Sequence, residues 1–230
     1  MSDKMGEFIR RSSRESKKGQ KHLKVFGTID VFVKDPLPEN VDIISVIEDV
    51  EEKVPHHLVG EVDALYVGNF KEFEEKQVNA MYRDGAIYVT NKQSNNADMI
   101  DDIIHEIAHA VEHIYAREIY ADNQIQQEFL GKRRRLRDMI GQYGYLDGLQ
   151  VPFEELEYSQ ELDNFLYKKL GYDKLEAFCA GLFLRPYAVT DVREYFATAF
   201  EDYLLKDRRY VLKLSPVAYY KITAICSDEV

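Results

Sequence analysis

One stretch of the chain, IIHEIAHAVEH from Ile103 to His113, restricts the fold more than any other. Its apolar residues recur every three or four positions, which is the period of a helix with one buried face. Asn95 or Asn96 is suited to cap this helix, and the pattern runs on as far as Ile119. Other elements must cover the helix along a broad apolar stripe, formed by Ile100, Ile103, Ile104, Ile107, Ala108 and Val111.

The same helix carries a pattern suited to a metal ion. His105 and His109 are four residues apart, so their imidazoles project from one face and can share one ion at about 2.0 to 2.1 Å. Glu106 lies beside them, where a carboxylate can accept a proton from a metal-activated water. His113 cannot join the pair, because about 12 Å of helix separates it from His105. The pattern predicts a zinc site with Glu106 as general base, and the alternative is an ordinary helix with surface histidines.

A later segment, YAVTDVREYFATAF from Tyr187 to Phe200, bears on the third ligand. Together with HEIAHAVEH it resembles the zinc metalloprotease domain of anthrax lethal factor and its relatives, including the clostridial Pro-Pro endopeptidases. Those proteins follow the HExxH helix with a second helix whose first Glu is the third zinc ligand, and with a Tyr seven residues earlier that lies over the metal. The resemblance spans residues 60 to 115 and 180 to 205. It implies one zinc ion, a zincin-like fold, Glu194 as third ligand and Tyr187 as a catalytic residue.

One position departs from the resembled pattern. Lethal factor and many gluzincin-type peptidases carry an acidic residue four positions after the ligand Glu, where it orients a zinc-binding histidine, and this chain has Thr198 there. A metal-bound imidazole normally gives its other N–H to an acceptor. We expect Thr198, or Asp202 from the next turn, to accept that hydrogen bond.

The activity that the resemblance implies is hydrolysis of peptide bonds in a peptide or protein substrate. The formal net charge of −11 argues against a nucleic-acid partner, which needs clustered basic residues, and weakly favours basic peptides by electrostatic steering. Thr198 leaves an alternative open, a binding or structural module that keeps the zincin fold without productive turnover. The intact Glu106 disfavours that alternative, because a structural zinc site has no use for a general base.

The residues before the motif helix predict a mixed sheet. Alternating apolar residues predict one strand over residues 22–35, helical spacing predicts a helix over 41–54, and a second strand is expected over 63–70. Two short β-branched and aromatic runs surround Asp84 and Gly85, which suit a hairpin turn because both positions take positive φ. A β–α–β unit and a hairpin are therefore expected before the motif helix.

The residues after the motif helix predict a mainly helical C-terminal part. Residues 120–163 are polar, with Gly, Pro and acidic residues near their end, and are expected to form an insertion beside the site. Pro186 is expected to end one helix and Thr190 to cap the next. The whole pattern predicts a single α+β domain over residues 21–230.

Two basic runs need an explanation in an acidic chain. Residues 1–20 are polar and Ser-rich, which predicts a disordered tail, and the run GKRRRLRDMI is expected to form a solvated helical face with Leu136, Met139 and Ile140 facing inward.

The sequence also bears on the compartment. No apolar run approaches the roughly 18 to 20 residues of a membrane span, and residues 1–20 lack the apolar core of a secretory signal. Cys179 and Cys226 lie too far apart to indicate a disulfide framework. These features predict a cytoplasmic protein, or one delivered by a route without a secretory signal peptide.

Overall fold

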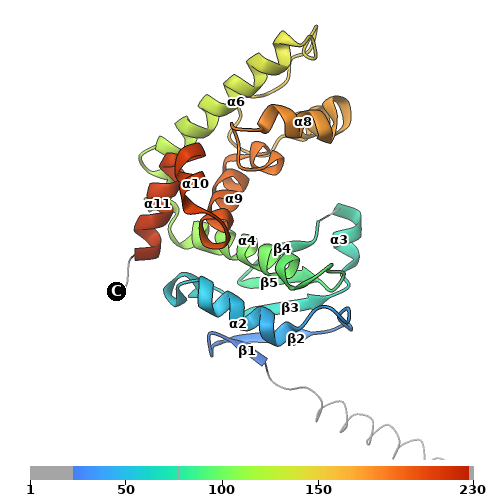
Figure 1. The fold of residues 1–230 in the computed structure, drawn as a ribbon, viewed down its shortest axis with the longest axis vertical. Helices are drawn as coiled ribbons and strands as arrows, with labels where there is room; N and C mark the ends of the chain where they lie inside the picture. The colour runs from blue at the N-terminus through green and yellow to red at the C-terminus, as the bar shows by residue number, and fades with distance from the viewer. Residues whose placement is uncertain (1–22, 77, 228–230) are drawn as a thin grey trace, which may run out of the picture.

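The first part of the described chain forms a mixed five-stranded sheet (Figure 1). The computed structural model describes residues 23–76 and 78–227. The strands lie in the order β1-β2-β3-β5-β4, so that β1 and β4 are the two edges. Together with the helices that follow, the sheet gives the α+β class expected from the sequence. The strands are β1 (Leu23–Val25), β2 (Ile29–Val33), β3 (Ala64–Gly68), β4 (Ala80–Arg83) and β5 (Ala86–Thr90).

The predicted β–α–β unit is present, with one correction at its start. β2 and β3 are parallel and are joined by α2 (Ile43–Lys53) and a short 3₁₀ turn. The single strand expected over 22–35 is instead a hairpin of β1 and β2, which turns at Phe26 and Gly27 with φ of 55° and 68°. The turn has three residues, an odd number, so the apolar residues keep the same alternation on both sides of it. For that reason the alternation predicted one strand.

The predicted hairpin at Asp84 and Gly85 is confirmed, with φ of 49° and 78° at the two residues. It joins β4 to β5 in antiparallel register, and β5 also pairs in parallel with β3. The short helix α3 (Lys71–Lys76) leads from β3 towards β4. Among the described strands, β4 therefore pairs on one side only, and its other side lies next to the helix that follows the hairpin.

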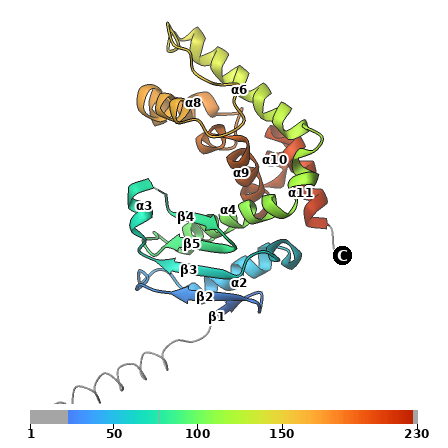
Figure 2. The same ribbon diagram turned by 180° about the vertical axis from the view of Figure 1, so that it is seen from behind.

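That following helix is α4 (Asn96–Ile114), and it carries the histidine pattern. Asn95 caps it by accepting a hydrogen bond from the amide of Asp98, as predicted. It ends at Tyr115, where the expected continuation becomes a separate short helix, α5 (Ala116–Tyr120). Figures 1 and 2 show α2 and α4 on the same face of the sheet.

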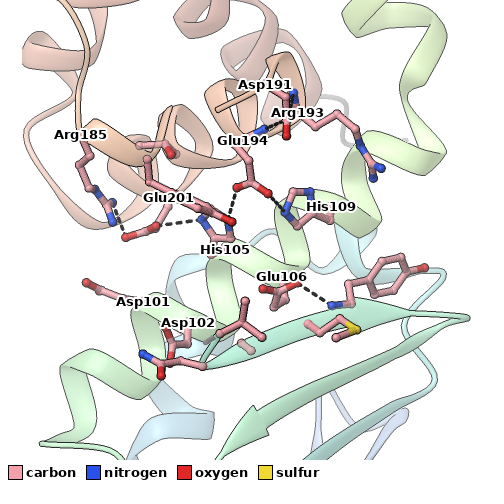
Figure 3. Close-up of a pocket in the computed structure, with 17 residues that line it drawn as sticks. Asp101, Asp102, His105, Glu106, His109, Arg185, Asp191, Arg193, Glu194 and Glu201 are labelled. Atoms are coloured by element: carbon pink, nitrogen blue, oxygen red, sulfur yellow. Dashed lines mark hydrogen bonds and ion pairs between the residues drawn. The ribbon is translucent and has the colours of Figure 1, made fainter. Parts of the chain in front are cut away.

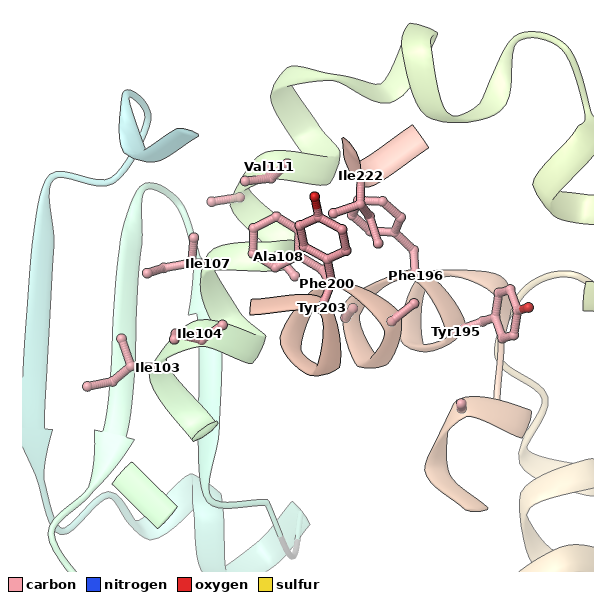
Figure 4. Close-up of a cluster of buried hydrophobic side chains, with 14 of the residues drawn as sticks. Ile103, Ile104, Ile107, Ala108, Val111, Tyr195, Phe196, Phe200, Tyr203 and Ile222 are labelled. Atoms are coloured by element: carbon pink, nitrogen blue, oxygen red, sulfur yellow. The ribbon is translucent and has the colours of Figure 1, made fainter. Parts of the chain in front are cut away.

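The core lies on both sides of α4 (Figure 4). Ile103 and Ile107 point towards the sheet, where they meet apolar residues of β1, β2, β3 and α2. On its other side α4 packs against α9 (Val192–Leu205), whose Phe196 and Phe200 are fully buried. The apolar stripe predicted from the sequence is thus covered by two different layers.

The expected insertion over 120–163 contains a long packed helix. α6 (Gln124–Gln142) buries Phe129, Leu136 and Ile140 completely. The residues that follow form three further helical segments after an irregular stretch, α7 (Gln160–Asp163), the π-helical η2 (Asn164–Gly171) and α8 (Tyr172–Cys179).

The predicted solvated face of the basic run is wrong for two of its residues. Lys132 and Arg133 are buried, whereas Arg134 and Arg135 are exposed as expected. The Lys132 ammonium donates to the backbone carbonyls of Leu182 and Leu214, and the Arg133 guanidinium donates to those of Pro152 and Glu155. These cations satisfy carbonyl groups of distant segments, and sequence spacing cannot show such contacts.

The C-terminal part contains two further corrections, at Pro186 and at Thr190. Pro186 begins a 3₁₀ turn, η3 (Pro186–Val189), and does not end a helix. Asp191, not Thr190, caps α9 by accepting from the amides of Arg193 and Glu194. Two helices complete the described chain, α10 (Arg208–Leu214) and α11 (Pro216–Ser227).

Three sequence expectations concern the whole chain. The basic tail expected over residues 1–20 lies outside the described residues. Within the described ranges, no helix combines the length and apolar character needed to cross a bilayer. Cys179 and Cys226 are both free thiols, in keeping with the expected lack of a disulfide framework.

The contact between α4 and α9 can be tested by removing one of its aromatic rings. Phe200→Ala should lower the free energy of unfolding by about 3 to 5 kcal/mol, because the ring is fully buried and its loss leaves a cavity. Tyr220→Ala is the control, since that ring is 64% exposed and should change stability by less than about 0.5 kcal/mol. Urea unfolding measures both, and equal losses in the two variants would contradict the described packing.

Candidate metal centre

A cleft of about 520 Å³ lies between the edge strand β4, the helix α4 and the segment formed by η3 and α9 (Figure 3). Of the seven residues that the sequence singled out as site residues, six line the cleft and Asp202 does not. The lining residues are Val78, Asn79, Ala80, Met81, Tyr82, Asp101, Asp102, His105, Glu106, His109, Arg185, Tyr187, Asp191, Arg193, Glu194, Thr198 and Glu201.

The three expected metal ligands converge in this cleft. His105 Nε2 lies 3.0 Å from Glu194 Oε2, and His109 Nε2 lies 3.5 Å from Glu194 Oε1. One ligand atom from each of the three residues lies within 4.8 Å of the others. Bonds of about 2.1 Å to a tetrahedral ion place neighbouring ligands about 3.4 Å apart, so the spacing suits a metal ion.

Local structure explains why these side chains meet. His105 and His109 are one turn apart on α4, and Glu194 is in the first turn of α9. Asp191 fixes that turn, because its carboxylate accepts from the backbone amide of Glu194 at 2.9 Å. The packing of α4 on α9 then brings the carboxylate of Glu194 over the two imidazoles.

The outer nitrogens of both imidazoles contact carboxylates that the sequence analysis did not single out. His105 Nδ1 lies 3.3 Å from Glu201 Oε2, and His109 Nδ1 lies 3.4 Å from Glu112 Oε2. Helical spacing would have revealed both, since Glu112 follows His109 by three residues and Glu201 follows Glu194 by seven.

The expected roles of Thr198 and Asp202 need correction. Among the described residues, the acceptor beside His105 Nδ1 is Glu201. Thr198 is buried and lines the cleft, and Asp202 is turned towards Arg185 and Lys206, to which it is ion-paired.

Glu106 is anchored to the edge strand. Its Oε2 accepts a hydrogen bond of 2.6 Å from the backbone amide of Tyr82 on β4. The side chain is 7% exposed, and burial raises the pKa of its carboxyl against the opposing effect of His109 and His105. No described residue bonds Oε1, so this oxygen remains available to a molecule in the cleft.

Tyr187 lies at the cleft wall beside the histidines. Its ring centroid is 6.1 Å from that of His105, and its side chain is about half exposed. Partial burial of the phenol in the cleft, followed by the charges of Glu194 and Asp191, raises its pKa well above the usual value. The phenol therefore stays protonated and can donate a hydrogen bond.

The protonation states of the three expected ligands, His105, His109 and Glu194, depend on one another. Burial alone would lower the pKa of both imidazoles, but hydrogen bonds to Glu194, with Glu201 for His105 and Glu112 for His109, raise it to about 9 and about 10. Burial alone would raise the pKa of Glu194, but the two imidazoles lower it to about 2. Protons and a metal ion therefore compete for the same nitrogens.

Comparisons with protein-family models, with curated proteins and with solved structures find no match to this chain. The candidate site therefore rests on its own residues. Two imidazoles and one carboxylate form a donor set that suits zinc better than the oxygen-seeking ions magnesium and calcium.

Zinc binding should depend on pH in a direction fixed by the two histidines. One zinc ion should bind per chain, and its affinity should rise between pH 6 and pH 8, because both imidazoles have pKa values above this window and must lose protons to bind. Competition with a chelator at several pH values measures the slope. His105→Ala/His109→Ala is the control, and zinc binding of equal affinity in that variant would exclude the cleft as the site.

Proposed function

We propose that this protein is a zinc-dependent metalloendopeptidase of the gluzincin type. The convergence of His105, His109 and Glu194 in a cleft that also holds Glu106 carries the proposal. Each of these residues has the chemistry that its role requires. The resemblance to the lethal factor domain, although limited to two segments, supports the same roles.

His105, His109 and Glu194 would hold the metal. When bound there, zinc would supply a Lewis acid that polarises a substrate carbonyl and lowers the pKa of a water molecule. The lowered pKa of Glu194 keeps this ligand ionised throughout the physiological range. Its negative charge offsets part of the charge of a divalent ion inside a partly buried site.

Glu106 would act as general base. Its anchored oxygen, bonded to the amide of Tyr82, fixes the direction of the carboxylate, and the other oxygen can take the proton of the attacking water. Burial raises its pKa above the usual value for a glutamate, which makes the carboxylate a better proton acceptor. The protonated Glu106 could then give its proton to the leaving amine.

Tyr187 would stabilise the developing oxyanion. Its protonated phenol lines the cleft beside His105, and it can donate its O–H to a carbonyl oxygen that gains negative charge. The half-exposed position of the ring leaves it free to meet a substrate.

The edge strand supports an extended peptide as substrate. The Tyr82 amide points away from β5, since it bonds Glu106, and the backbone groups of Ala80 share that direction because orientation alternates along a strand. An extended peptide could pair with the outward backbone groups of Ala80, as in other β-augmentation complexes, whereas the Tyr82 amide is already bonded to Glu106.

The charged side chains that line the cleft support a preference for basic peptides. Six carboxylate side chains line the cleft, against only two guanidinium groups, Arg185 and Arg193. The excess favours peptides with basic side chains near the cleaved bond. The carboxylates are Asp101, Asp102, Glu106, Asp191, Glu194 and Glu201.

The alternative of an inactive binding module loses its main support. That alternative rested on Thr198, which lacks the carboxylate expected to orient a histidine. Glu201 lies in contact with His105 and has the required chemistry, so the residue at 198 does not by itself imply a weak site.

The general base can be separated from metal binding by one substitution. Glu106→Gln should keep zinc near one ion per chain and lower peptide cleavage by about 10²–10⁴-fold or more, because the amide cannot accept the proton. A survey of new N-termini produced in a peptide mixture supplies the substrate. Full activity in this variant would show that the cleavage comes from a contaminant or another site.

The tyrosine makes a separate prediction. Tyr187→Phe should lower kcat by roughly 10²–10³-fold with little change in KM, because its hydrogen bond matters mainly in the transition state. Tyr220→Phe, on an exposed ring of α11, is the matched control. If Tyr187→Phe retains kcat while Glu106→Gln loses it, the tyrosine role is wrong and the peptidase proposal stands.

A further inference from the structure

The imidazole of His105 lies between two carboxylates of the same helix (Figure 3). Its Nε2 is 3.0 Å from Glu194 Oε2, and its Nδ1 is 3.3 Å from Glu201 Oε2. Seven residues of α-helix fall about 20° short of two full turns, so Glu194 and Glu201 share one face of α9. Thr198 lies one turn after Glu194 on that face.

The carboxylate of Glu201 is held in place on its other side. Its Oε1 accepts from the Arg185 guanidinium, which also bonds Asp202 on the same helix. Glu201 is 2% exposed. The group is thus a buried acceptor with its two oxygens directed at two different partners, His105 and Arg185.

We propose that Glu201, clamped by Arg185, is the positioning residue that keeps the proton of His105 on Nδ1 and leaves Nε2 for the metal. This inference rests on the proposed zinc peptidase function. Glu201 thereby replaces, from two turns along α9, the acidic residue that the resembled proteins carry where this chain has Thr198. His109 has its own acceptor, Glu112, so the two ligands are positioned independently.

The role requires a carboxylate and not merely a polar side chain. His105 Nδ1–H and the Arg185 N–H are both donors, and they face different oxygens of Glu201. A glutamine offers one acceptor oxygen and one NH₂ group, so one of the two donors would face another donor. Either His105 would lose the hydrogen bond that fixes its imidazole, or Arg185 would lose its hydrogen bond to residue 201.

A matched pair of substitutions tests the role. Glu201→Gln should weaken zinc binding by about 10- to 100-fold in competition with a chelator. Asp101→Asn is the control, because it removes a negative charge from the same cleft and has no hydrogen bond or ion pair with His105 or Arg185 among the described residues. It should stay within about threefold of the unaltered protein, since the histidine keeps its acceptor. Melting temperatures of the two metal-free variants show whether both are folded.

Long-range ¹H–¹⁵N NMR of the zinc-loaded protein gives a readout that a purely structural role would not change. The unaltered protein should show a slowly exchanging Nδ1–H on both ligand histidines. Glu201→Gln should remove or shift the His105 signal and leave that of His109, which is bonded to Glu112, as an internal control. A missing Nδ1–H on His105 in the unaltered protein overturns the proposal, even if the variant does not fold.

The outcomes separate this inference from the proposed function. If the unaltered protein binds no zinc, both the proposed function and the positioning role of Glu201 are wrong. If it binds zinc and Glu201→Gln binds it equally well, or Asp101→Asn weakens it as much, the positioning role is wrong and the zinc site remains.

Discussion

The contact between α4 and α9 is the interaction on which the candidate site depends. The two helices are joined by apolar side chains that are fully buried, among them Ile104, Ala108, Phe196 and Phe200. On one side of this contact the two imidazoles of α4 meet the first turn of α9. Burial of large rings of this kind contributes several kcal/mol, so the geometry of the cleft is determined by packing and not by the polar contacts within it.

The polar contacts around the cleft then determine orientation more than stability. Buried ion pairs gain little net energy, because removing each charge from water offsets most of their attraction. Here each carboxylate that contacts the Nδ1 atom of a ligand histidine also meets a cation, Glu112 with Arg193 and Glu201 with Arg185. A buried carboxylate that contacts an arginine is restricted in direction, and so is the imidazole that it contacts.

Local patterns predicted the elements well, and long-range contacts limited the rest. The i, i+4 histidines and the Asp84-Gly85 turn depend on neighbours in sequence, and both were predicted correctly as structural features. The turn at Phe26 escaped detection because an odd loop length preserves alternation. Burial of Lys132 depends on carbonyl groups fifty and eighty-two residues away, which no spacing rule includes. Thr198 and Asp202, four and eight residues past Glu194, were expected to face His105, but Glu201 at seven residues lies closer to the face of Glu194 and meets the ring.

The hydrogen bond from Tyr82 to Glu106 also affects how far β4 can be extended sideways. Unpaired edge strands invite other chains to add to the sheet, and proteins restrict such growth by removing donors from the edge. The Tyr82 amide is already bonded to a carboxylate, so a strand added beside Ala80 finds no donor at the next outward position. Pairing with an added strand would then be limited to Ala80. The hydrogen bond between Tyr82 and Glu106, which orients the Glu106 side chain, would therefore also limit aggregation through this edge.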